Sequence, residues 1–155
     1  MDNAISQDVR RRLEEVQKLE TWARGLSAAM KAPNAIASDV ERFLKVTNVP
    51  DAPFDFEIEF VGRRIRAHYS WFTHNTAGKI EGAGRYSFFA YKSHPSMLDE
   101  LKDEALLILD FGLDGKIVLG EDHLQFHPNV PEYNDERRAI LMVYIAEALL
   151  KDSLE

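Results

Sequence analysis

The strict alternation of apolar and acidic residues at positions 54–60 constrains the fold of this chain more than any other feature. Every second side chain is apolar and each residue between is acidic: Phe54, Phe56, Ile58 and Phe60 alternate with Asp55, Glu57 and Glu59. Successive side chains of a β-strand point to opposite faces of its sheet. The pattern therefore predicts a half-buried strand.

A hairpin is expected to follow this strand. Gly62-Arg63 is typical of a two-residue loop with glycine in the first position. That loop sets a register in which Ile58 lies opposite Ala67 and Glu57 lies opposite His68. We therefore interpret His68 as one half of a surface cross-strand pair rather than as a catalytic group.

The segment after this hairpin is predicted to be a glycine-rich loop over residues 73–84 and a strand over residues 85–92. The glycine spacing matches neither the P-loop nor the dinucleotide-binding fingerprint, so a flexible loop is expected. Alternation places Tyr86, Phe88 and Ala90 on one face of the strand and Ser87, Phe89 and Tyr91 on the other. The sequence leaves open which of these faces is buried.

An exposed aromatic face on this strand would be a candidate protein-binding surface. If Phe89 and Tyr91 point away from the core, they join Phe72 and His68 on the same side of the sheet. Exposed aromatic patches mark interfaces more often than other surfaces do. Cover by a helix is the alternative.

The remaining patterns complete an α+β fold with an antiparallel sheet of five to six strands in a single domain, residues 1–155. Residues 1–48 are expected to form a helical hairpin, with one helix over 6–31 and a shorter one after Ser38. The sheet is expected within residues 54–127. Its other predicted parts are a short helix at 97–104, strands at 105–111 and 123–127, and a loop at 113–115 that pairs Phe111 with Ile117.

A long C-terminal helix is expected over residues 134–152, and its apolar arc is unusually wide. Two adjacent stripes run along it: Leu141, Tyr144, Ile145, Ala148 and Leu149 form the first, and Ile140, Val143, Leu150 and Leu154 form the second. One sheet face does not need so wide an arc. We expect this helix to pack between the sheet and either the N-terminal helices or a second subunit, which would make a homodimer through the C-terminal helix.

Composition and charge exclude several classes of function. The 155 residues include 19 basic and 26 acidic ones, for a net charge of −7, which argues against nucleic acid or an anionic membrane surface as partner. The absence of cysteine excludes disulfides, thiolate catalysis and Cys-ligated metals. The N-terminus lacks the apolar core of a signal peptide, and no apolar run approaches the length of a membrane span. We expect a cytoplasmic protein.

The histidines do not form a recognisable metal or catalytic motif. His123 and His127 lack the glutamate of the helical zinc motif, and on a strand they would lie about 13 Å apart. No G-x-S-x-G nucleophile motif is present. We therefore expect no metal, no cofactor and no catalytic residue.

Two functions remain in view. The first is a non-catalytic, intracellular protein-binding module of the acidic chaperone, immunity, inhibitor or adaptor type. Its predicted order of helices and strands is similar to that of type III secretion chaperones, which bind unfolded segments of exported proteins as homodimers; the resemblance lies in element order alone. The alternative is a small enzyme or ligand-binding domain that uses His68, His74, His123 and His127 around the 73–84 loop, with or without a metal.

Overall fold

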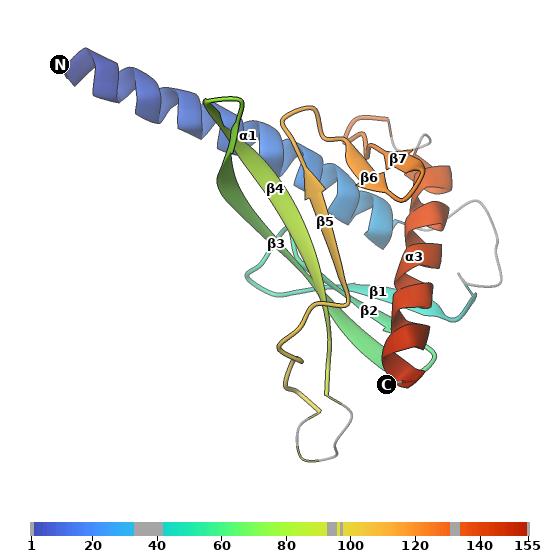
Figure 1. Ribbon diagram of the computed structural model, residues 1–155. Helices are drawn as coiled ribbons and strands as arrows, with labels where there is room; N and C mark the ends of the chain where they lie inside the picture. The colour runs from blue at the N-terminus through green and yellow to red at the C-terminus, as the bar shows by residue number, and fades with distance from the viewer. Residues whose placement is uncertain (1, 33–41, 93–95, 97, 131–133, 155) are drawn as a thin grey trace.

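The described residues of the chain form a seven-stranded antiparallel sheet and two long helices (Figure 1). The computed structural model describes residues 2–32, 42–92, 96, 98–130 and 134–154. The strands lie in the sheet in sequence order, which confirms the α+β antiparallel class. The elements are α1 (Asp2–Lys31), β1 (Leu44–Asn48), β2 (Phe56–Phe60), β3 (Arg63–Thr76), β4 (Lys79–Ala90), β5 (Leu107–Phe111), β6 (Ile117–Leu119), β7 (Asp122–Leu124) and α3 (Asn134–Leu154).

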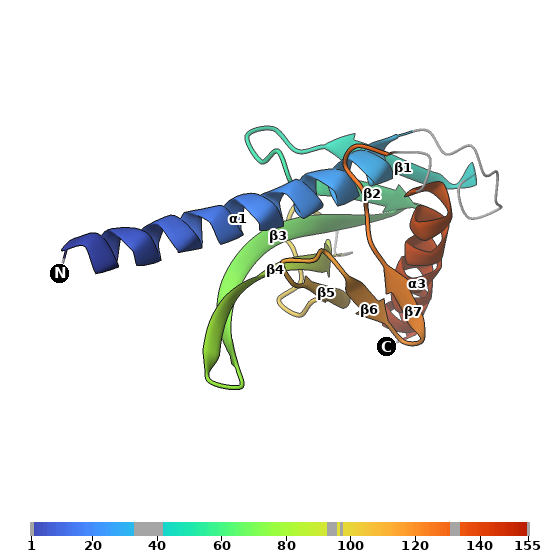
Figure 2. The same ribbon diagram turned by 90° about the horizontal axis from the view of Figure 1, so that it is seen from above.

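The sheet is concave around α3 and the C-terminal half of α1, and both helices lie on this side; the far end of the β3–β4 hairpin bends away from α1 (Figure 2). Buried side chains of α1, α3 and the inward face of the sheet form one hydrophobic cluster. The α1 contribution follows helical spacing, because residues three or four apart share one face. Its members are Leu19, Ala23, Leu26, Ala29 and Met30. The opposite, convex face of the sheet carries neither of the two helices.

The predicted N-terminal helical hairpin is wrong within the described residues. The first predicted helix is confirmed as α1, but Leu44–Asn48 forms strand β1, in which Val46 lies opposite Ile58 of β2. Leu44 and Val46 alternate with polar residues, and this period of two favours a strand once a partner strand is present. Residues 33–41, where the second helix was expected to begin, lie outside the described residues.

The predicted register of the first hairpin is also wrong, by two residues. The turn consists of Val61 and Gly62, with φ angles of 49° and 76°, so Ile58 lies opposite Ile65 rather than Ala67. Two consecutive left-handed residues are the mark of a type I′ turn, whose twist matches that of the flanking strands. A shift by an even number leaves every side chain on its predicted face.

The predicted glycine-rich loop at residues 73–84 is instead the end of a long hairpin. β3 and β4 continue to a turn at Ala77 and Gly78. Two glycines inside β4 allow close packing: a Cβ on Gly82 would lie 3.2 Å from Glu15 Oε2, and one on Gly84 would lie 2.3 Å from the Phe111 ring. These glycines therefore allow Glu15 and Phe111 to pack closely against β4; they do not make a flexible loop.

The predicted short helix at 97–104 is wrong for the residues described there. Residues 100–106 run beside β4 instead: the Lys102 N–H donates to the Ala90 carbonyl, and the Leu106 N–H donates to the Phe88 carbonyl, at 2.8 and 2.7 Å. Because no helix interrupts the strands in the described part of this segment, the order expected by analogy with type III secretion chaperones is not kept.

The last third of the chain is closer to expectation. Phe111 pairs with Ile117 as predicted, across a turn in which Gly115 is left-handed with φ 75°. The strand expected at 123–127 is shorter, Asp122–Leu124, and the C-terminal helix extends to Leu154. With β1 added, the sheet has seven strands rather than five to six.

An ion-pair cluster holds the end of α3 against the sheet. The Asp152 carboxylate accepts hydrogen bonds from Lys102 Nζ and from Arg63 Nη2 of β3, both at 2.8 Å. The hydrogen bond from Lys102 outweighs partial burial and, with Arg63, lowers the pKa of Asp152 below its ordinary value. The carboxylate therefore remains ionised at and below neutral pH.

Asp152→Asn is expected to lower the free energy of unfolding by about 1 kcal/mol at neutral pH. The pKa of Asp152 is lower in the folded state than the value of about 3.9 expected in the unfolded chain, so its contribution is present above that value and disappears as pH falls through the folded-state pKa. Urea titrations of both proteins between pH 7 and pH 3 test this. Glu147→Gln, which removes an exposed carboxylate from the same helix, should show no such convergence; equal pH dependence of both variants would contradict the prediction.

Candidate binding face

The convex face of the sheet carries all four residues of the predicted protein-binding surface. Tyr86, Phe88 and Ala90 are fully buried, which decides the question that the sequence left open. Phe89 and Tyr91 therefore point outward, and they are half-buried. On β3, exposed His68 and half-buried Phe72 share this face, because they alternate with inward-facing residues.

These four residues do not form one patch. Phe89 lies opposite Arg66, whereas Phe72 lies opposite Ala83, six residues further along β3. Six residues of strand span about 20 Å. The structure thus divides the predicted surface into a Tyr91 cluster (Tyr91, Arg64 and Glu57) and a Phe72 cluster (Phe72, Arg85 and Asp110).

The Tyr91 cluster is held by hydrogen bonds and a cation–π contact. The Arg64 guanidinium carbon lies 4.2 Å from the centre of the Tyr91 ring, and the Tyr91 hydroxyl donates to Glu57 Oε1 at 2.5 Å. Partial burial opposes ionisation of Glu57, but hydrogen bonds from Tyr91 and Arg64 lower its pKa overall. Burial and the bond to Glu57 raise the pKa of Tyr91. The tyrosine therefore remains a donor and Glu57 an anion at neutral pH.

The Phe72 cluster borders an open groove. The Arg85 guanidinium carbon lies 4.6 Å from the Phe72 ring centre, and its Nε and Nη2 donate to the two Asp110 oxygens at 2.7 and 3.0 Å. The groove has a volume of about 530 Å³ and includes two exposed aliphatic side chains, Ile108 and Val118. An apolar floor beside a fixed ion pair suits an amphipathic side chain of a partner.

His68 contacts Asp55, not Glu57, which corrects the predicted pair. His68 Nδ1 lies 2.8 Å from Asp55 Oδ2, and the same carboxylate accepts Arg66 Nη2 at 3.0 Å and the Tyr69 N–H at 2.9 Å. Asp55 is almost fully buried. Its side chain therefore accepts the main-chain N–H of Tyr69 just before β2 begins, where, in the described residues, β3 has no neighbouring strand on that side.

Sequence reasoning missed Asp55 because the alternating pattern treats it as an ordinary outward residue. The signal for its different role is Pro53, two residues earlier, which prevents the strand from beginning sooner. Sequence reasoning did not single out Glu15 either, because a charged helix residue is usually solvated. It lies four residues before Leu19 on the buried stripe of α1, and its Oε2 accepts the Gly82 N–H at 2.9 Å.

The histidines considered for catalysis do not come together: His68 and His74 lie six residues apart on β3, and the other two lie elsewhere. The His74 ring packs near Phe72 on β3, His123 lies in β7, and the His127 ring centre is 5.9 Å from that of Trp22 on α1. Across the described ranges, no three histidine or carboxylate side chains gather in a way that would hold a metal ion. The contact with Asp55 holds one ring nitrogen of His68 beside a carboxylate, and we interpret it as a structural contact.

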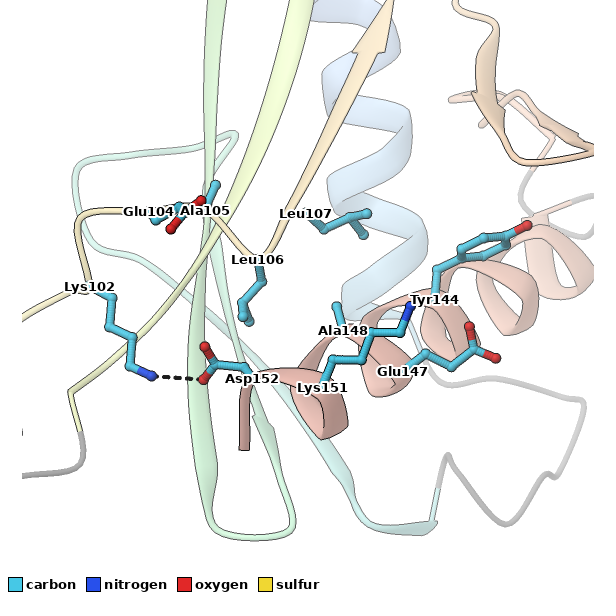
Figure 3. Close-up of a pocket in the computed structure, with 10 residues that line it drawn as sticks. All are labelled: Lys102, Glu104, Ala105, Leu106, Leu107, Tyr144, Glu147, Ala148, Lys151 and Asp152. Carbon is cyan, nitrogen blue, oxygen red and sulfur yellow. Dashed lines mark hydrogen bonds and ion pairs between the residues drawn. The ribbon is translucent and has the colours of Figure 1, made fainter. Parts of the chain in front are cut away.

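A second groove, of about 480 Å³, lies between α3 and the segment that leads into β5 (Figure 3). The Lys102–Asp152 ion pair closes one end of it, and Leu106, Leu107 and Ala148 supply apolar surface. Beyond this groove, Val143 and Leu150 of the second α3 stripe are exposed at 45% and 63%. The wide arc is thus only partly covered, and a homodimer through α3 stays a prediction.

Comparison with models of known protein families, with curated proteins and with solved structures found no match. In the part of the chain that the structure describes, neither helix is apolar enough over a sufficient length to cross a lipid bilayer.

Proposed function

We propose that this chain is a non-catalytic protein-binding module, of the chaperone, inhibitor or adaptor type, and that the convex face of its sheet contacts the partner. One observation carries the proposal. The two helices pack on the concave side only, and the convex face presents aromatic rings that arginine side chains hold in place.

The residue composition of the convex face supports this proposal. Tyrosine, phenylalanine and arginine are enriched at protein interfaces, where they supply most of the binding energy. Arg64 and Arg85 are each held by a carboxylate and an aromatic ring. Side chains that are ordered before binding lose less conformational entropy when a partner arrives. Each arginine is balanced by an acid, so the face favours a partner of mixed polarity over a polyanion.

A capture experiment tests the proposal. The chain is immobilised and exposed to lysate of its source cells, in parallel with the double variant Ile108→Glu/Val118→Glu and with Phe89→Ser. A stoichiometric partner that both convex-face variants lose supports the proposal. Leu150→Glu, at an exposed position of α3, is the control and should retain the partner. Capture that the convex-face variants leave unchanged contradicts the assignment of this surface.

Phe89→Ser is expected to reduce the free energy of unfolding by only about 1 kcal/mol, because Phe89 is half-buried on the convex face. The adjacent Phe88 is fully buried, so Phe88→Ser should cost at least about 3–5 kcal/mol. Urea unfolding of both variants measures the difference. Similar losses for the two would place Phe89 in the core and remove it from the proposed surface.

A further inference from the structure

Strand β3 has a long edge without a neighbouring strand. β2 pairs with β3 only from Arg63 to Ala67, whereas β3 continues to Thr76. Asp55 accepts the Tyr69 N–H, the next main-chain group on that side. Beyond Tyr69, in the described structure, no strand lies beside β3 on this side. We name residues 70–76 on this side the free edge.

The direction of its main-chain groups follows from the register. The Tyr91 N–H donates to the Arg64 carbonyl, so the even-numbered residues of β3 bond to β4. The Tyr69 N–H points the other way, toward Asp55. Because main-chain groups of an antiparallel strand alternate in direction, those of Trp71, Thr73 and Asn75 face outward from the free edge.

The free edge lacks the usual protection against pairing. Natural edge strands carry lysine, proline, inward charges or bulges that block another strand. The sequence Ser70-Trp71-Phe72-Thr73-His74-Asn75-Thr76 contains no Lys, Arg, Asp, Glu or Pro, although the chain as a whole has a net charge of −7. Two identical edges can therefore meet antiparallel with no carboxylate or ammonium group opposite a like charge.

The N-terminal half of α1 extends past this same edge. Figures 1 and 2 both show the first turns of α1 projecting beyond the β3–β4 hairpin. We name residues 2–14 of α1 the arm. Val9 and Leu13 of the arm are exposed at 53% and 58%. A helical segment of this length is marginal in water without a packing surface.

The hairpin beside the arm has matching uncovered apolar groups. Trp71 and Ile80, on the concave side of β3 and β4, are exposed at 47% and 51%. Arg12 of the arm donates to the Ile80 carbonyl of its own chain, so when two copies join at the free edge we expect the part of each arm beyond this contact to reach the hairpin of the other copy. The exposed arm and the uncovered hairpin of one chain thus become the two halves of one self-complementary contact, as a two-fold interface requires.

We propose that the chain forms a homodimer in which the free edges pair antiparallel, so that one sheet runs through both copies, and in which each arm packs on the second copy. The interface uses the main-chain edge of residues 70–76 together with the arm and does not involve α3; it adjoins the convex face at Phe72, whose side chain belongs to the Phe72 cluster. The proposal does not depend on the proposed function, and failure of either leaves the other standing.

Sedimentation velocity over a concentration series tests it. The wild-type chain is expected to have twice the mass of one chain. Thr73→Pro removes an outward N–H without touching a bond to β4, and Leu13→Glu places a charge on the arm; each should raise the dissociation constant about a hundredfold or more. Thr73→Val and Leu150→Glu are the matched controls and should leave it unchanged.

Amide exchange of the wild-type chain gives a readout that does not depend on how the variants fold. The amides of Trp71, Thr73 and Asn75 should become protected as concentration rises, whereas those of Phe72 and His74, already bonded to β4, should be protected throughout. A wild-type monomer at every concentration overturns the proposal. So does a dimer that tolerates Thr73→Pro and Leu13→Glu, and so does one that Leu150→Glu alone disrupts, which would place the contact on α3.

Discussion

Ile58→Asp is expected to abolish cooperative folding. Ile58 is fully buried at the centre of β2, between Val46 of β1 and Ile65 of β3. A carboxylate there would lie within the hydrophobic cluster of the core, and burying an unpaired polar or charged group costs several kcal/mol. The lost isoleucine contacts add about 2–5 kcal/mol more. Together these losses are comparable with the whole stability of about 5–15 kcal/mol that a domain has.

Circular dichroism during heating measures this outcome. We expect the Ile58→Asp chain to show no sigmoidal transition, or to be insoluble. Ile58→Val, which removes one methylene from the same position, should remain folded with a loss of about 1 kcal/mol. A soluble aspartate variant with unchanged Tm would mean that the side chain of residue 58 does not face the core.

Gly25→Ala is expected to lower the free energy of unfolding by about 2 kcal/mol, although alanine is the better helix former by about 1 kcal/mol. Gly25 lies inside α1, and a Cβ there would lie 2.5 Å from the Phe126 carbonyl oxygen and 3.1 Å from the Pro128 nitrogen. Both are main-chain atoms, which cannot rotate out of the way as a side chain does. The segment at 126–128 must therefore move away from the helix.

Urea unfolding tests the sign of this change. Ala28→Gly, at an exposed position of the same helix, makes the reverse exchange where nothing is packed and should cost about 1 kcal/mol through helix propensity alone. A gain in stability for Gly25→Ala would mean that residues 126–128 do not lie against α1.

For the candidate site, the sequence could predict which neighbouring side chains of a strand share a face, but it could not predict which of them are in contact. Alternation of side chains along β3 and β4 is a local property, so His68 was expected to share a face with Phe72, and Phe89 with Tyr91, while the choice of the buried face of β4 stayed open. Their separation depends on the length of the β3–β4 hairpin. Because residues 73–84 were predicted to form a loop, the sequence set no register between β3 and β4, and the distance between Phe72 and Phe89 could not be predicted.

The partner of His68 was also beyond local reasoning. A loop displaced by one position moves every cross-strand pair by two residues, and so the predicted Glu57–His68 pair became Glu57–Arg66. Asp55 contacts His68 instead. Because β2 begins one residue after Asp55, the carboxylate can turn toward β3. Strand ends of this kind are set by the competing elements around them.

The sequence by itself determined what depends on period and turn chemistry: the alternating face of β2, the helix at residues 6–31, the loop at 113–115 that pairs Phe111 with Ile117, and the helix at 134–152. These follow from side-chain geometry within a few residues. Only the tertiary structure decided that residues 44–48 form a strand, that Gly25 and Gly84 serve close packing, and that β3 continues past its neighbour. The reason is that pairing and packing join residues far apart in the chain, and their energies appear only when both partners are in place.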